Sequence, residues 1–151
     1  MKHQEIRYRI LLLLYYKHYS NQLGHPQVTD NVIREAGLEY VDKNFVYGDI
    51  VYLVESSLVK AKMEMLGKPY PGALIISAKG INVAEHMVED FIKFLDEKGD
   101  KESKSQAETL KTIGPSTAQL NEIKGMIDHN SKLFQEFIGK VVSTNITYKY
   151  I

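Results

Sequence analysis

Residues 46–80 read VYGDIVYLVESSLVKAKMEMLGKPYPGALIISAKG, and the spacing of their apolar side chains changes along the way. Val46, Ile50 and Leu53 recur at intervals of three and four residues, which is the period of a helix with one buried face. Asp42 precedes them as a candidate capping residue, because its carboxylate can accept hydrogen bonds from first-turn amides. The pattern predicts a helix over residues 43–56.

After this helix, the apolar side chains recur at every second residue. Over residues 58–66, apolar side chains alternate with Lys60, Lys62 and Glu64, as in a half-exposed strand. Residues 67–72 (GKPYPG) have the composition of a turn, and residues 73–77 form a second apolar run. We expect the two strands to pair as a hairpin with a loop of roughly six residues.

Helices are expected on both sides of this hairpin. Upstream, residues 5–20 form one helix, and Thr29 or Asp30 caps a short helix that runs to Ala36 and stops at Gly37. Downstream, Asn82 is expected to cap a helix that reaches about Glu97.

The first helix is apolar on nearly all sides, so a second element should cover it. That cover is either a partner subunit or residues 116–151 of the same chain. Its aromatic side chains either complete the core or form an interface. The tyrosines concerned are Tyr8, Tyr15, Tyr16 and Tyr19.

The rest of the chain suggests a domain boundary. Residues 98–109 read KGDKESKSQAET and are almost free of apolar side chains, as in a linker. We therefore divide the chain into a first domain (1–97), a polar linker (98–115) and a C-terminal segment (116–151). That segment begins with a helix opened by Pro115 and Ser116. Residues 141–151 either add a strand to a sheet edge or form an ordered tail.

Composition excludes several classes of protein. With 151 residues, 44% hydrophobic and 25% charged, the chain has the size and balance of one globular domain. Its 19 basic and 19 acidic residues cancel, so nucleic-acid binding would need a local basic patch. The apolar run Ile10–Tyr16 is far short of the roughly 20 residues of a membrane span. Since it also lacks a cleavage site of small residues, we expect a soluble cytoplasmic protein with no membrane contact.

The sequence contains no recognisable catalytic or metal-binding pattern. The absence of cysteine excludes disulfides, thiolate nucleophiles and cysteine–zinc sites. Histidine pairs for zinc, nucleophile elbows and glycine-rich phosphate loops are missing as well. His86 and Asp90 share a helix face but have no third ligand nearby, which favours a surface ion pair over a metal site. We therefore expect no enzyme activity, no cofactor and no bound metal.

The order of expected elements resembles the winged helix-turn-helix family over residues 5–97. The first two helices contribute ILLLLYY and NVIREAGL. The run YLVESSLVKAK resembles the end of a recognition helix that continues into the first wing strand, GKPYPG takes the place of the wing, and ISAKG resembles the close of the second strand. The resemblance implies an α+β fold of three helices, a wing hairpin and a fourth helix. The C-terminal segment resembles no family that we recognise.

The resemblance also implies a function, because many winged-helix proteins are homodimeric transcription regulators. The helix over residues 43–56 would enter the major groove of DNA, and the hairpin would contact phosphate or the minor groove. The dimer would form through the first helix, the helix at 82–97 and the C-terminal helix. The implied DNA-binding residues are Lys43, Asn44, Tyr47, Gly48 and Val51 on the helix and Lys60, Lys62, Lys68 and Tyr70 on the hairpin.

Charge supports this function only weakly. From Lys43 to Lys79 the chain has five lysines against Asp49, Glu55 and Glu64, and Asp49 would repel phosphate from the middle of the recognition helix. These features favour an alternative, a winged-helix module that binds another protein and does not read DNA. In that alternative, the C-terminal segment binds the partner.

A second basic stretch lies at the N-terminus, where four cations face Glu5 alone. It is either a phosphate-facing surface or the solvated side of a helix. The cations are Lys2, Arg7, Arg9 and Lys17.

Overall fold

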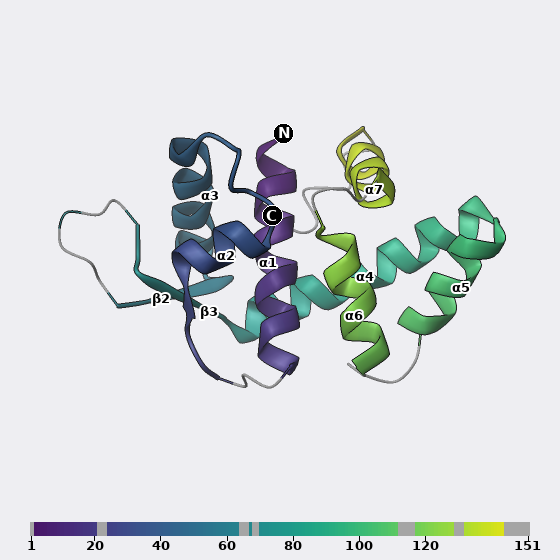
Figure 1. Ribbon diagram of the computed structural model, residues 1–151, viewed down its shortest axis with the longest axis horizontal. Helices are drawn as coiled ribbons and strands as arrows, with labels where there is room; N and C mark the ends of the chain where they lie inside the picture. The colour runs from purple at the N-terminus through teal and green to yellow at the C-terminus, as the bar shows by residue number, and fades with distance from the viewer. Residues whose placement is uncertain are drawn as a thin grey trace.

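The computed structural model describes residues 2–20, 24–63, 67, 70–111, 117–128 and 132–143. Within these ranges, seven helices hold about 70% of the residues, beside one small three-stranded sheet (Figure 1). The elements are α1 (His3–Tyr19), β1 (Gln27–Val28), α2 (Thr29–Glu35), α3 (Lys43–Glu55), β2 (Val59–Lys62), β3 (Ala73–Ile76), α4 (Ala78–Lys98), α5 (Lys101–Leu110), α6 (Thr117–Met126) and α7 (Lys132–Ser143).

The expected fold class, an α+β winged helix-turn-helix, is therefore wrong, because the fold is mostly helical. Two features make the helical content higher than expected. The strands are short, with at most four residues each. In addition, α4 runs for 21 residues and is followed by three more helices in the described ranges.

The sheet is antiparallel, with strand order β1-β3-β2. Strands β2 and β3 pair as the sequence predicts, with Val59 opposite Ile76 and Lys62 opposite Ala73. Strand β2 ends earlier than expected, since Met63 has a φ of 54°, a left-handed conformation that breaks the extended chain. Strand β1 has only two residues, too few to show an alternating pattern, and the sequence did not predict it.

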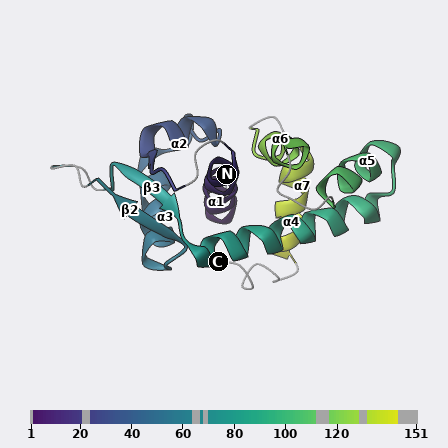
Figure 2. The same ribbon diagram turned by 90° about the horizontal axis from the view of Figure 1, so that it is seen from below.

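Helix α1 runs through the centre of the molecule. Figure 2 views it nearly end-on: α2, α3 and the sheet lie on one side, α6 and α7 on the other, and α4 runs past both. Tyr8 and every residue from Ile10 to Tyr15 are buried. The second side of α1 is thus covered by the C-terminal helices of the same chain. The tyrosines of α1 complete the core, Tyr16 and Tyr19 being partly buried against it.

Helix α4 begins at Ala78, earlier than the cap expected at Asn82. The Ser77 side chain accepts a hydrogen bond from the Gly80 amide (3.0 Å) and donates one to the Ser57 carbonyl (2.6 Å). Ser77 therefore caps α4 and also ties its start to the residues that follow α3. The helix ends at Gly99, which adopts the left-handed conformation that glycine tolerates best (φ 75°).

The segment expected as a polar linker contains helix α5. Asp100 caps it, accepting a hydrogen bond from the Ser103 amide (3.1 Å), and its inward side is formed by Ser103, Ala107 and Leu110, all buried. These small and widely spaced side chains do not form the apolar stripe by which helices are recognised in sequence. Further along, α7 continues to Ser143, and residues 144–151 of the expected strand or tail lie outside the described residues.

Helices α4 and α7 are joined by aromatic side chains and ion pairs. The Phe91 and Phe137 rings meet edge to face with centroids 5.2 Å apart. Lys98 pairs with Glu136 (2.8 Å), and Lys140 pairs with Glu97 (2.6 Å). Across the ranges described, no helix is both long and apolar enough to cross a membrane.

Candidate nucleic-acid interface

Helix α3 presents one side to the core and one side to solvent. Asp42 caps it, as predicted, by accepting a hydrogen bond from the Asn44 amide (2.8 Å). Its buried residues are Val46, Asp49, Ile50 and Leu53. Of the implied DNA-binding residues on this helix, Lys43, Asn44 and Gly48 are exposed, and Tyr47 and Val51 are half-buried.

Asp49 does not face solvent, contrary to what we expected from the sequence. Only 2% of Asp49 is exposed, and its carboxylate contacts two side chains of α1. The Arg7 Nε donates to Oδ1 at 2.9 Å, and the His3 Nδ1 lies 2.7 Å from Oδ2. The negative charge is therefore neutralised on the inner side of α3 and does not oppose a phosphate on the outer side.

The basic N-terminal stretch is likewise used inside the fold. Arg9 is fully buried and binds the Glu5 carboxylate and the Ile127 carbonyl. Lys17 pairs with Glu35 of α2 at 3.0 Å. With Arg7 bound to Asp49, three of the four cations in this stretch are used in contacts within the fold and are not free to bind phosphate.

The hairpin residues divide into three groups. Lys60 and Lys62 are exposed on β2, where they follow the buried Val59. Lys68 lies outside the described residues. Tyr70 is only 7% exposed, so the expectation of an exposed wing residue is wrong for it.

Tyr70 is instead a structural link between the hairpin, α2 and α3. Its ring stacks on Tyr47 with centroids 3.8 Å apart and an angle of 15° between the planes. Its hydroxyl donates to Asp30 Oδ1 at 3.2 Å. The hydrogen bond with Tyr47, burial and the nearby Asp30 charge together raise the pKa of Tyr70 above its ordinary value, so the hydroxyl stays protonated.

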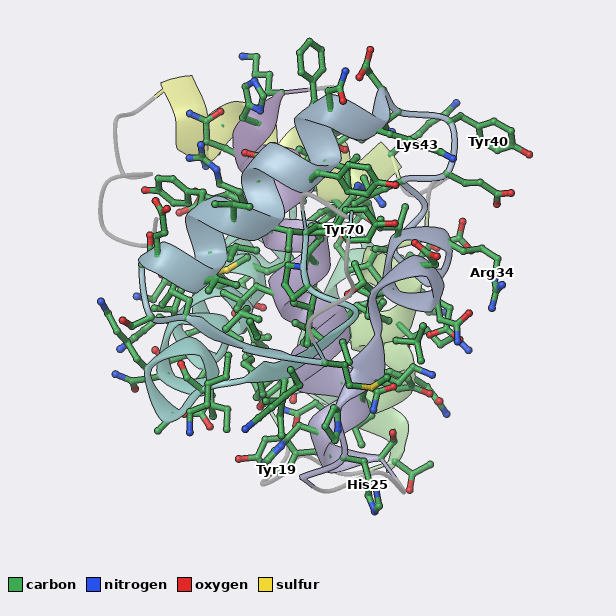
Figure 3. The ribbon with its side chains drawn as sticks, turned by 90° about the vertical axis from the view of Figure 1, so that its left-hand side faces the viewer. Tyr19, His25, Arg34, Tyr40, Lys43 and Tyr70 are labelled. Atoms are coloured by element: carbon green, nitrogen blue, oxygen red, sulfur yellow. The ribbon has the colours of Figure 1, made fainter. Side chains whose placement is uncertain are left out.

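A cleft of about 300 Å³ opens beside this stacked pair, between α2 and the start of α3. It brings together three predicted residues, Lys43, Tyr47 and Tyr70, while Lys60 and Lys62 do not line it. Figure 3 shows Arg34, Lys43 and Tyr70 on the same side of the molecule. The remaining lining residues, which sequence reasoning missed, are Asp30, Ile33, Arg34 and Glu39.

No sequence signal marks those four residues as part of a site. They are ordinary residues of a short helix and its following turn, and only the packing of Tyr70 against α2 and α3 makes them line a cleft. His86, the candidate metal ligand, lies 3.4 Å from Glu89, and Asp90 pairs with Lys93. In the part of the chain that the structure describes, no three side chains of the metal-binding types gather.

Because Asp49 is buried, the exposed charge of residues 43–79 is slightly more basic than their sequence count suggests. Between residues 43 and 79, the exposed charged side chains that the structure describes are Lys43, Lys60, Lys62, Lys79 and Glu55. Three exposed acids on the neighbouring α2 side, Asp30, Glu39 and Asp42, cancel this excess of three, and the exposed Arg34 adds one cation. The local surface is therefore close to neutral, with its lysines on the hairpin and at the two ends of this segment.

Comparisons with known proteins add no relative: no protein-family model, curated protein or solved structure matches the chain.

Proposed function

We propose that the protein binds double-stranded DNA through α3 and the β2–β3 hairpin, as a homodimeric cytoplasmic transcription regulator. The observation that carries this proposal is the burial of Asp49. Because Arg7 and His3 hold the Asp49 carboxylate inside, the outer side of α3 carries Lys43 and Asn44 near its start. Between Lys43 and Glu55 the helix has no exposed acid, and the exposed Asp42 before it is used as its cap. The element order from α1 to β3 also resembles that of winged-helix regulators, within a mostly helical fold.

The proposed mechanism assigns each group a separate task. Lys43, Lys60 and Lys62 neutralise phosphates, which supplies affinity that depends on salt but not on sequence. Asn44 is at the first turn of α3, where its amide can make two hydrogen bonds with adenine in the major groove. The Tyr47–Tyr70 stack keeps α3 and the hairpin in a constant relative position.

Because α1 is buried within the chain, it cannot supply the dimer contacts that we first expected. In the proposal, those contacts come from the outward side of α4 or from α7. Light scattering on the purified protein would give twice the chain mass for a homodimer, and a single chain mass would remove this part of the proposal.

The test is fluorescence anisotropy with a labelled random duplex, titrated at low and near-physiological salt. We expect micromolar binding that weakens steeply with salt. Replacing Lys60 and Lys62 together by glutamine should lower the slope of log affinity against log salt by about two, because each lysine neutralises one phosphate.

A matched control uses Lys101 and Lys104, two exposed lysines of α5, which lies far from α3 and the hairpin (Figure 1). Replacing both by glutamine changes the net charge by the same amount and should leave the slope unchanged. Equal effects of the two double variants would show that binding depends only on net charge. No binding even at low salt would remove the proposal.

An alternative function, a protein-binding module, is favoured by exposed aromatic side chains. Tyr40, which precedes α3, is 92% exposed, and Phe45, in the first turn of α3, is 53% exposed. Aromatic residues of this kind are enriched at protein interfaces. This alternative predicts no duplex binding at low salt together with a stable complex that Phe45→Ala weakens.

A further inference from the structure

The cleft between α2, the start of α3 and Tyr70 combines an apolar wall with charges of both signs. Ile33, Tyr47 and Tyr70 form the apolar part. Arg34 and Lys43 supply two cations, and Asp30 and Glu39 supply two acids. Its volume of about 300 Å³ is at the lower end of the range for small-molecule sites.

The charged groups are largely free to bind a ligand. Within the described residues, Arg34, Lys43 and Glu39 take part in no ion pair, although other charged residues of the same helices do. Asp30 uses only Oδ1, which accepts the Tyr70 hydroxyl, so its second carboxylate oxygen has no partner in these ranges. The Tyr70 hydroxyl is committed to its bonds with neighbouring side chains and does not compete for a ligand.

This lining discriminates between ligand classes by charge. A phosphate or another multiply charged anion would meet Asp30 and Glu39 in the cleft and be repelled by them. A purely cationic ligand would be repelled by Arg34 and Lys43. A zwitterion avoids both repulsions, because its anionic group can bind the two cations and its cationic group can bind the two acids.

We propose that this cleft binds a free amino acid with an aromatic or large apolar side chain. Arg34 and Lys43 bind its carboxylate, Glu39 and the free oxygen of Asp30 bind its ammonium group, and the side chain packs on Ile33 and the Tyr47 ring. The proposal does not depend on DNA binding, since none of these contacts involves a nucleic acid.

The protein offers a direct assay because it contains no tryptophan. Free L-tryptophan can therefore be excited selectively, and its fluorescence anisotropy should rise with protein concentration and saturate at one ligand per chain. Two analogues test the two charges separately: indole-3-propionate lacks the ammonium group, and tryptamine lacks the carboxylate. Each should bind about tenfold more weakly than L-tryptophan, which is the usual effect of removing a charged hydrogen bond.

Substitutions locate the site. Arg34→Gln and Lys43→Gln should each weaken L-tryptophan about tenfold. The same two substitutions should not weaken tryptamine, whose positive charge they relieve of a repulsion. Glu39→Gln should likewise weaken L-tryptophan but not indole-3-propionate. Lys60→Gln and Glu55→Gln, at exposed positions outside the cleft, are the matched controls and should change nothing.

Three results would each overturn the proposal. The first is no anisotropy change up to the solubility limit of L-tryptophan. The second is equally tight binding of indole-3-propionate, which would indicate an anion site. The third is binding that the cleft variants and the control variants weaken alike. Since all the substitutions are at exposed side chains, circular dichroism should confirm that each variant remains folded.

Discussion

Gly80 in the first turn of α4 occupies a position with no room for a side chain. A Cβ atom there would collide with the backbone carbonyl of Leu58 and approach the Ile76 side chain to 2.8 Å. Because one of these neighbours is backbone, it cannot turn aside. Gly80→Ala should therefore lower the free energy of unfolding by about 3 kcal/mol, measured by urea denaturation.

Gly48 provides the matched comparison in α3, since a Cβ atom there would meet nothing within 4 Å. Glycine inside a helix costs conformational entropy, so Gly48→Ala should raise the free energy of unfolding by about 0.5–1 kcal/mol. If the two substitutions shifted stability in the same direction, the packing described around Gly80 would be wrong.

Tyr15 should make the fold less stable as the pH rises above 10. Burial, together with the charges of Glu85 and Tyr19, raises the pKa of Tyr15 from 10.0 to about 12. Below pH 10 the hydroxyl is protonated in both the folded and the unfolded chain. Between pH 10 and 12 the unfolded chain releases this proton while the folded chain retains it, so stability should fall.

The check is urea denaturation at several pH values in this window, compared with Tyr15→Phe. The variant should lose less stability between pH 10 and 12 than the wild-type protein does. Part of the loss should remain, since the pKa of Tyr70 is also raised. An identical pH profile for the two proteins would show that Tyr15 does not titrate as described.

At the scale of elements, one buried arginine joins α1 to the C-terminal helices. The Arg9 Nε donates to the Glu5 carboxylate at 3.1 Å, Nη1 donates to the Ile127 carbonyl at 2.5 Å, and the guanidinium lies 5.3 Å from the Phe134 ring. Removing only the cation leaves a largely buried carboxylate without its partner. Arg9→Met should therefore lower the free energy of unfolding by about 3–5 kcal/mol.

The double variant Glu5→Leu, Arg9→Met tests the reason for this destabilisation. It removes both charges, so no unpaired carboxylate is left inside, and it should be more stable than Arg9→Met alone. A double variant as unstable as the single one would show that the Ile127 contact, not the ion pair, accounts for the effect.

At the scale of the whole molecule, one cluster of buried side chains extends from α1 to α7. It includes Leu11 of α1, Phe91 of α4, Ala107 of α5, Ile123 of α6 and Phe134 of α7. The cluster thus crosses the boundary expected near residue 97. A core shared in this way makes the N-terminal part dependent on the helices that follow it.

A fragment ending at Gly99 should consequently fail to fold as a cooperative unit. Without α6 and α7, one side of α1 would be exposed, and its apolar residues there would no longer contribute hydrophobic stabilisation. Thermal unfolding followed by circular dichroism should show no sharp transition for the fragment, whereas the full chain should show one. A cooperative transition in the fragment would establish residues 1–99 as an independent domain.

The candidate interface was predictable in part. The α3 surface at Lys43, Asn44 and Gly48, and the exposed Lys60 and Lys62, follow from helical and strand periodicity, which determines the side of an element each residue lies on. Arg34 and Glu39 could not be predicted as cleft residues, nor could the burial of Tyr70. Those positions depend on how α2, α3 and the hairpin pack together, and periodicity within one element contains no such information.

The amino-acid sequence by itself determined three local features: the helix after Asp42, the pairing of the strands before and after residues 67–72, and the need for another element to cover the second side of α1. These depend on interactions between residues close in the chain or on the apolar content of one helix. Only the tertiary structure decided that α6 and α7 supply that cover and that Asp49 is neutralised by Arg7 and His3. Both results come from contacts between residues more than 40 positions apart, whose pairing the local sequence does not encode.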